Sequence, residues 1–195
     1  MSRSWPVTLE SGRVGVRPLR RRDATAWARL RADSAAWLTP WEATLPPEGG
    51  RPATSYVAMA SIMLRRARRG DAMPFVVTWD GRMVGQVTVN GITWGSARSA
   101  SIGYWIGRGH AGQGIIPTAV ALVCDHLFLT AGIHRIDIAV RPENDPSLAV
   151  VRKLGFDDVG LARRYLHIDG RWCDHRLFQL VREDVGTTVL ARLTD

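Results

Sequence analysis

The sequence has little cysteine, a single lysine and no long apolar run. Its two cysteines, Cys124 and Cys173, lack metal-ligand spacing and are too few for a disulfide framework, so both are expected to be reduced structural thiols. The apolar stretch 119–129 is interrupted by two polar residues and is far shorter than the roughly 20 residues of a membrane-spanning helix. The N-terminal residues also lack the apolar core of a secretory signal. We therefore expect one domain over residues 1–195, located in the cytoplasm, with no membrane association.

Negative charge is also scarce relative to positive charge, which gives a formal net charge of +8. Arginine supplies nearly all of the positive charge, since Lys153 is the only lysine. Such an excess favours encounters with nucleic acid, the ribosome or acidic phosphates, but it can equally reflect a genome-wide bias in codon usage. The runs 20–22 and 65–69 are interpreted as solvated helix faces, and no nucleic-acid motif is visible. Ribosome association is therefore an option that the charge alone does not decide.

Hydrophobic periodicity predicts an α/β (α+β) chain. Alternation predicts strands over 12–19, 73–79, 83–89, 100–106, 135–140, 160–167 and 171–181, and helical spacing predicts helices from 23 onward and over 55–69, 115–129 and 146–154. The pairs Asp80-Gly81 and Asp169-Gly170 are hairpin turn signals, so the strands beside them should be antiparallel. The helix between 100–106 and 135–140 makes those two strands parallel.

A glycine-rich turn lies between the strand 100–106 and the helix 115–129. Residues 107–114 contain four glycines, which let the chain curl with its amide groups pointing inward, ahead of the unsatisfied amides of a helix N-terminus. Such a turn can bind a pyrophosphate, although glycines can also simply permit a tight turn. The turn lacks both the Gly-Lys-Ser/Thr ending of a P-loop and the acidic partner of a dinucleotide fold. A phosphate-bearing cofactor of another kind remains.

Residues 102–106 (Ile-Gly-Tyr-Trp-Ile) followed by 112–116 (Gly-Gln-Gly-Ile-Ile) resemble the strand and pyrophosphate loop of the RimJ/RimL-type acetyltransferases, which belong to the GNAT superfamily. Residues 144–147 (Asn-Asp-Pro-Ser) and 153–156 (Lys-Leu-Gly-Phe) resemble the second half of that cofactor site. The first position of the superfamily's Arg/Gln-x-x-Gly-x-Gly/Ala pattern is Gly109 here, a departure from the family.

This resemblance implies the GNAT fold, a mixed and mostly antiparallel seven-stranded sheet with about four helices and splayed central parallel strands. It also implies acetyl-CoA as cofactor, with coenzyme A as product. The residues expected to bind it are Tyr104, Trp105, Ile106, His110, Ala111, Gly112, Gln113, Gly114, Ile115, Asn144 and Ser147. Backbone N–H groups near residues 104–106 would polarise the thioester carbonyl.

The resemblance also points to Ser147 as the donor of a proton to the leaving thiolate, as RimL-type enzymes are thought to use a serine. An equally weighted alternative is a helix N-terminal serine that bonds only to backbone. The glutamate and tyrosine of the RimI branch are replaced here by Ala139 and Val151. The base stays unassigned: Glu42, Asp71 and His110 are conceivable, whereas charged groups of the last hairpin, including His175, are expected to face solvent.

The acceptor implied by the resemblance is the N-terminal amine of a protein, in particular a ribosomal protein that begins with alanine or serine. Trp41, Glu42 and Tyr165 are expected to contact it, with Trp37 beside them. Two other functions stay open: a transferase for a small-molecule amine such as an antibiotic or polyamine, and a non-catalytic module that binds acetyl-CoA and docks on the ribosome. We expect no metal ion, and a monomer or weak dimer.

Overall fold

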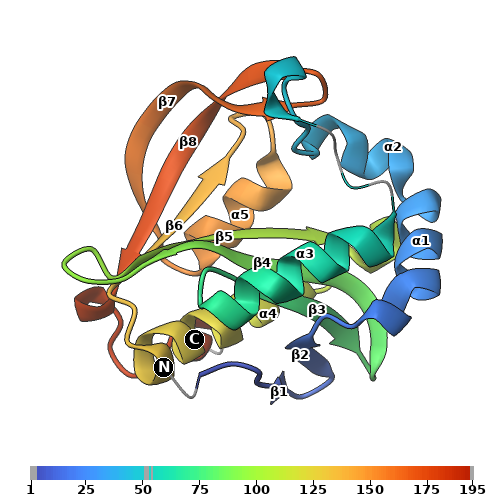
Figure 1. Cartoon of the computed structure of the whole chain (residues 1–195). Helices are drawn as coiled ribbons and strands as arrows, with labels where there is room; N and C mark the ends of the chain where they lie inside the picture. The colour runs from blue at the N-terminus through green and yellow to red at the C-terminus, as the bar shows by residue number, and fades with distance from the viewer. Residues whose placement is uncertain (1–3, 51–52, 54, 194–195) are drawn as a thin grey trace.

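Eight strands form one sheet in the computed structural model, which describes residues 4–50, 53 and 55–193 (Figure 1). The strands are β1 (Leu9–Ser11), β2 (Val14–Pro18), β3 (Met73–Trp79), β4 (Arg82–Thr93), β5 (Ser99–Ile106), β6 (Arg135–Val140), β7 (Asp157–Ile168) and β8 (Arg171–Val181). Their order is β1-β2-β3-β4-β5-β6-β8-β7, and of these described strands β5 and β6 are the one parallel pair of neighbours. The predicted mixed sheet is confirmed, with one more strand than the seven predicted because β1 adds a three-residue edge.

Within the described residues, five α-helices accompany the sheet: α1 (Ala24–Asp33), α2 (Ala35–Leu38), α3 (Tyr56–Arg69), α4 (Ile115–His126) and α5 (Asp145–Lys153). Four of them match the predicted helices, and α2 is an additional single turn. The predicted helix 115–129 is α-helical only to His126, after which Leu127–Ala131 forms a π-helical turn. Among the described residues, no helix has both the length and the apolarity needed to cross a bilayer.

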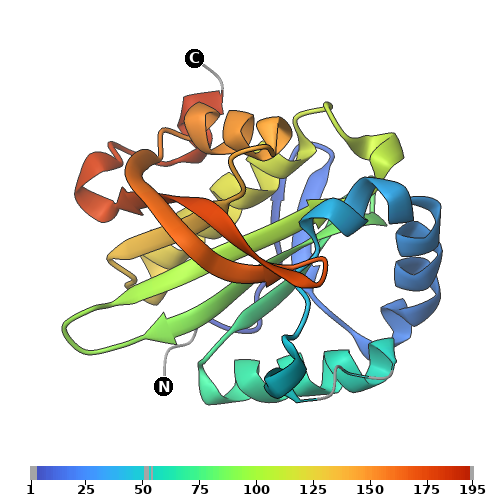
Figure 2. The ribbon, with the colours of Figure 1, turned by 90° about the horizontal axis from the view of Figure 1, so that it is seen from above.

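The helices cover the two faces of the sheet (Figure 2). α4 and α5 lie on one face, where the main core joins Val87, Ile102 and Ile138 to α4 residues such as Val120. α1 and α3 lie on the other face, over a smaller cluster that includes Tyr56 and Val76. Each strand therefore presents alternate residues to an α4 face and to an α3 face.

Both hairpins predicted from turn chemistry are present. Asp80 and Gly81 have φ values of 48° and 77°, and Asp169 and Gly170 have 46° and 80°. Positive φ at both central residues is the geometry of a type I′ turn, whose twist matches that of the strands it joins. The second turn closes the long β7–β8 hairpin.

The two parallel strands separate after a short paired segment. β5 and β6 pair only at Ser99–Ser101 with Arg135–Asp137. Beyond that point β5 remains paired with β4 as far as Ile106, and β6 remains paired with β8 as far as Val140. A gap therefore opens between β5 and β6 toward their carboxyl ends, which confirms the predicted splay.

Candidate active site

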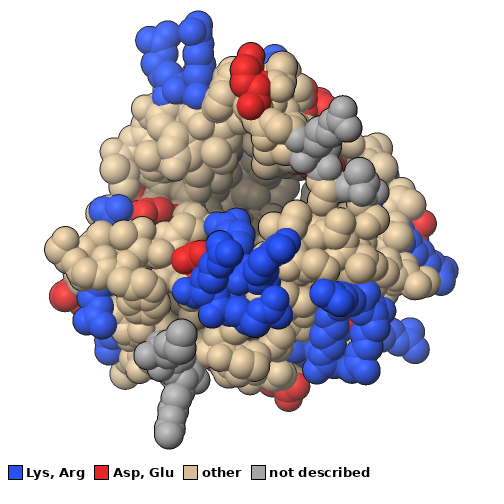
Figure 3. Space-filling model, viewed as in Figure 1, with Lys and Arg blue, Asp and Glu red and all other residues tan. Residues whose placement is uncertain are grey.

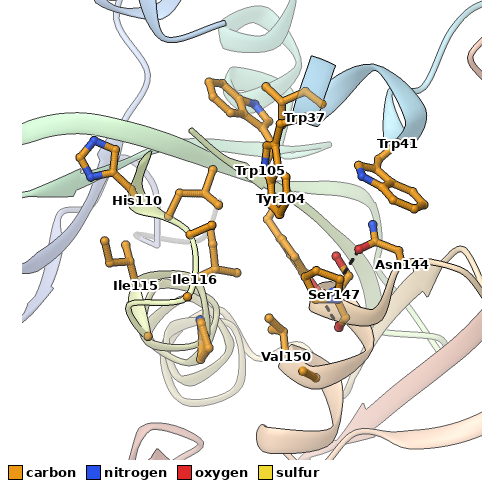
Figure 4. A pocket seen from close by; sticks show the side chains of 18 of the residues that line it. Trp37, Trp41, Tyr104, Trp105, His110, Ile115, Ile116, Asn144, Ser147 and Val150 are labelled. Atoms are coloured by element: carbon orange, nitrogen blue, oxygen red, sulfur yellow. Dashed lines mark hydrogen bonds between the residues drawn. The ribbon is translucent and has the colours of Figure 1, made fainter. Parts of the chain in front are cut away.

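A cavity of about 370 Å³ lies where β5 ends, between the glycine-rich turn, α2 and the first turns of α5 (Figure 4). Ten of the eleven predicted cofactor residues line it: Tyr104, Trp105, Ile106, His110, Ala111, Gly112, Gly114, Ile115, Asn144 and Ser147. Gln113 does not line the cavity, because its side-chain amide turns back and donates to the carbonyl of Gly109 at 3.1 Å. The predicted cofactor residues are thus brought together around one cavity.

Several lining residues were missed by the sequence reasoning. They are Leu38, Ile116, Pro117, Pro146, Ala149, Val150 and Lys153. Val150 and Lys153 follow Ser147 at successive steps of three residues along α5, so continuing that spacing would have found these two. Lys153 brings a cationic side chain to the cavity.

The glycine-rich turn has a run of unpaired backbone donors beside this cavity, among the residues that the structure describes. Gly112 and Gly114 adopt φ values of 75° and 73°, a left-handed conformation that disfavours any side chain. Among the described residues, none of the amides of 112–114 donates to a backbone carbonyl. Ile115 and Ile116 add the first two amides of α4, which no helical carbonyl can accept. Together with the partial positive charge of the helix N-terminus, these donors fit the pyrophosphate of the expected acetyl-CoA.

Backbone groups of β5 also face the gap between β5 and β6. The amide of Gly107 donates to Val84 of β4 at 2.9 Å, and the carbonyl oxygen of Trp105 lies so close to Gly85 that a Cβ there would be 2.4 Å away. Residues 105 and 107 thus point toward β4, and strand alternation turns the N–H groups of Tyr104 and Ile106 toward the gap. Of the three backbone N–H groups expected to polarise the thioester carbonyl, two therefore face the gap, those of Tyr104 and Ile106.

Asn144 and Ser147 organise the start of α5 beside the cavity. The side-chain oxygen of Asn144 accepts the Ser147 amide at 3.2 Å, which caps the helix. The Ser147 carbonyl accepts from the Tyr104 hydroxyl at 3.4 Å, while no partner is found for the Ser147 hydroxyl in the part of the chain described. Burial raises the pKa of Tyr104. Tyr104 thus stays a protonated donor, and the hydroxyl of Ser147 is free to meet a ligand.

Tryptophans form the wall of the cavity opposite α5 (Figure 4). Trp37, Trp41 and Trp105 line it. The Arg31 guanidinium carbon lies 5.4 Å from the centroid of the Trp105 ring, and Arg31 forms an ion pair with Glu42. Glu42 is therefore held by a cation and does not line the cavity.

Figure 3 shows a hollow on the α3 face of the molecule, and arginine side chains gather below it over α3. Its upper side is crossed by residues 42–44, here called the strap, which join the tip of the β7–β8 hairpin. The Asp169 amide donates to the Glu42 carbonyl at 3.1 Å, and the Thr44 amide donates to the His167 carbonyl at 2.9 Å. We refer to this depression as the α3-side hollow.

The remaining sequence candidates are dispersed. Tyr165 of β7 is 47% exposed and does not line the cavity. Cys124 is fully buried, and burial raises the pKa of its thiol, so it is an inert core residue. Asp71 is exposed at the end of α3, and its carbonyl accepts the Ile92 amide.

One expectation was wrong. His175 was expected to face solvent, yet only 3% of its surface is exposed. It is buried because β7 and the segment after β6 pack around this part of β8, a contact between distant residues that local patterns do not reveal. Within the described ranges, no group of three or more histidine, cysteine or acidic side chains could hold a metal ion.

Comparison with known proteins agrees with this geometry. Residues 13–157 match the acetyltransferase (GNAT) domain family. RimJ of Mycobacterium smegmatis, solved in complex with a CoA-disulfide, superposes with a TM-score of 0.92 at 40% identity, covering 100% of this chain and 96% of that one. The [ribosomal protein uS5]-alanine N-acetyltransferase of Escherichia coli is 29% identical over 91% of this chain and 92% of its own length.

A third relative, named probable N-acetyltransferase YjcK of Bacillus subtilis, is 38% identical over 105 residues. That match covers 54% of this chain and 58% of the relative. The cofactor expected from the sequence, acetyl-CoA, is thus the one that fits both the family and the glycine-rich turn. The chain belongs to the GNAT family of acetyltransferases, in its RimJ/RimL branch.

Proposed function

We propose that this protein transfers the acetyl group of acetyl-CoA to the N-terminal α-amine of a protein, by direct attack within a ternary complex. The acceptor is a ribosomal protein that begins with alanine or serine. The observation that carries the proposal is the gap between β5 and β6. It gives a cofactor in the cavity and an acceptor in the α3-side hollow a common meeting point.

The relatives support the acceptor class. The E. coli relative is named for alanine acetylation of ribosomal protein uS5, and it aligns with this chain over nearly its whole length. The M. smegmatis relative shares 40% of its residues and the same backbone arrangement. From the similarity to these two relatives we infer both the cofactor, acetyl-CoA, and the acceptor class, the N-terminus of a ribosomal protein, for this chain.

The cavity and the hollow are suited to different molecules. The cavity combines backbone donors with apolar walls, which suits a pyrophosphate followed by a pantetheine arm. The hollow is open to solvent and bordered on its upper side by the strap, which suits an extended peptide. Trp41, Glu42 and Tyr165 remain our proposed acceptor contacts, since they come from the strap region and from β7.

Each group at the gap has a proposed task. Bound acetyl-CoA supplies an activated thioester. The amides of Tyr104 and Ile106 donate to the carbonyl oxygen, where negative charge develops during attack. The free hydroxyl of Ser147 donates a proton to the departing sulfur. General acid catalysis requires that the donor lie within hydrogen-bond reach of the atom it protonates.

Three further expectations stay predictions. They are a single domain over the whole chain, a location in the cytoplasm where ribosomal proteins are made, and a monomeric or weakly dimeric state. The excess of arginine is compatible with docking on the ribosome, because positive charge favours encounters with RNA.

The test is a panel of acceptors incubated with acetyl-CoA and the purified protein. Peptides with free N-terminal Ala, Ser or Met are compared with N-terminally blocked copies and with polyamines, by thiol release and by mass spectrometry of the acetylated atom. Acetylation confined to free Ala or Ser N-termini is the expected result. Turnover of polyamines alone contradicts the acceptor class, and tight coenzyme A binding without any turnover contradicts catalysis.

A further inference from the structure

His175 is a buried side chain on the face of the sheet that the acceptor approaches. The strand registers pair Ala139 with Leu177 and Gln86 with Trp105. Because side chains alternate along a strand, His175 shares the α3 face with Leu177, Ala139 and Trp105. It lies one residue past the last β6–β8 pair, at the end of β6 where the gap is open.

The hydrogen bond of His175 fixes its tautomer. Its Nδ1 lies 3.0 Å from the carbonyl oxygen of Cys173. A carbonyl oxygen can only accept, so Nδ1 carries the proton and Nε2 of the neutral ring carries a lone pair. The unprotonated Nε2 therefore lies on the side of the ring opposite the Cys173 carbonyl.

Nε2 has no partner among the described residues and is not among the fully occluded polar atoms. The small exposed part of this ring, 3% of the residue surface, therefore includes its basic nitrogen. A buried histidine with one satisfied nitrogen and one accessible nitrogen is the arrangement of an oriented base.

The charged groups around His175 come from two segments. Arg141 follows β6, Glu143 lies in the same turn, and Asp174 is the neighbour on β8. Arg141 is itself held by the Pro40 carbonyl at 2.9 Å and by Glu143 at 3.1 Å. On β7 the ring of Tyr165 lies 6.0 Å from the imidazole. Burial is the largest influence and lowers the pKa of His175, and Arg141 lowers it too, whereas the hydrogen bond to the Cys173 carbonyl and the charges of Glu143 and Asp174 raise it. The net direction is downward, so the ring is neutral at pH 7.

We propose that Nε2 of His175 takes up the proton that the acceptor amine loses, directly or through one water, which makes His175 the general base of the reaction. This inference rests on the proposed function. The amine nitrogen forms a bond to the acetyl carbon, the carbon–sulfur bond breaks and its electron pair stays on sulfur. One proton passes from nitrogen to Nε2 and on to solvent, while sulfur receives a proton from Ser147, which is reprotonated by water.

The nearby carboxylates are worse placed to accept the proton of the acceptor amine. Glu42 is paired with Arg31. Asp137 shares the α3 face but lies where β5 and β6 are still paired, and Arg135 holds it at 3.2 Å. His175 is the group that combines a lone pair on an accessible nitrogen with a place beside the open end of the gap between β5 and β6.

The experiment uses His175→Asn, because the asparagine amide can overlay Nδ1 and keep the bond to Cys173 while the basic nitrogen is lost. We expect kcat for an acetylated peptide to fall by about 100-fold or more, the usual contribution of a general base. Affinity for coenzyme A should stay within about threefold. The matched control is His134→Asn, an exposed histidine at the far end of β6 that pairs with Glu183 and should leave kcat unchanged.

A pH profile separates a base from a structural residue. Deprotonation of the amine, with an ordinary pKa of about 8, gives log(kcat/KM) a slope of 1 on the acid side. Because the pKa of His175 is lowered, its protonation should steepen the slope toward 2 only at a pH below the ordinary histidine range in the wild type, and His175→Asn should keep a slope of 1. A variant with kcat within about threefold of wild type, or with the same steepening, overturns the inference.

A measurement without turnover completes the test. NMR of the ¹⁵N-labelled histidines should show His175 as the neutral Nδ1–H tautomer at pH 7, and a charged ring at that pH overturns the inference even if His175→Asn is poorly folded. If wild type acetylates no peptide N-terminus, the proposed function fails, and the inference fails with it. If wild type is active and His175→Asn remains active, only the inference fails.

Discussion

Replacing Ser147 with alanine should remove chemistry while leaving the fold intact. The Ser147 hydroxyl has no partner among the described residues, since the helix cap is made by the Asn144 side chain and the Ser147 amide. Removing it should change the free energy of unfolding by less than about 0.5 kcal/mol. For a chain of this size that corresponds to a shift in Tm of about 1 to 2 °C.

The effect on turnover should be much larger. General acid catalysis contributes about 100-fold or more, which equals about 2.7 kcal/mol of transition-state stabilisation. The assay is thiol release from saturating acetyl-CoA with a peptide acceptor, beside a thermal melt. Ser147→Thr keeps a hydroxyl and should recover part of the rate. A kcat for Ser147→Ala within about twofold of wild type would show that water protonates the sulfur and that our role for Ser147 is wrong.

Four other predictions address the cofactor turn, the strap, the thiol and the pH response. Gly114→Val should weaken coenzyme A binding about tenfold or more, as measured by calorimetry. The reason is that a side chain at a φ of 73° costs about 1 to 2 kcal/mol, so the glycine-rich turn must distort. An unchanged Kd would contradict the role of this turn in binding the pyrophosphate. Arg31→Met should raise the acceptor KM about tenfold with little change in coenzyme A affinity, because its contacts to Trp105 and Glu42 are lost; an effect confined to coenzyme A would contradict this. Cys124→Ala should keep kcat within about twofold, and loss of turnover would contradict its assignment as an inert core residue. Burial lowers the pKa of His126, so the unfolded chain binds more protons below about pH 6.5 and stability should fall as the pH drops. His126→Gln, which can still donate to the Ser4 carbonyl, should lose less stability than wild type between pH 7.5 and 5.5 in urea titrations, and an equal loss would contradict this origin.

Local chemistry in the sequence was sufficient for most of the fold. Asp80-Gly81 and Asp169-Gly170 predict type I′ turns because few residue pairs tolerate positive φ twice in succession, and both turns have that geometry. The glycine-rich turn likewise carried enough information to place the cavity. By contrast, β1 has only three residues, too few for any period to be visible, and α2 is a single turn in a segment that ends in proline and tryptophan.

The candidate site was harder to predict from the sequence where it depends on contacts between residues that lie far apart in the chain. Glu42 looked like a free carboxylate in the sequence, but folding brings Arg31 to it from α1. His175 sits near a hairpin, where charged groups are usually solvated, yet β7 and Arg141 bury it. Neither contact leaves a local pattern, so sequence reasoning could name these residues without giving them their surroundings.

The most direct test of the account is a crystal structure with a bisubstrate analogue, in which coenzyme A is joined through an acetyl linker to the N-terminus of an alanine-first peptide. We predict the pyrophosphate against the amides of 112–116, the pantetheine arm in the gap between β5 and β6, and the peptide in the α3-side hollow beneath the strap. Coenzyme A in the cavity with the peptide leaving on the α4 face, away from the hollow, would contradict the proposed path of the acceptor.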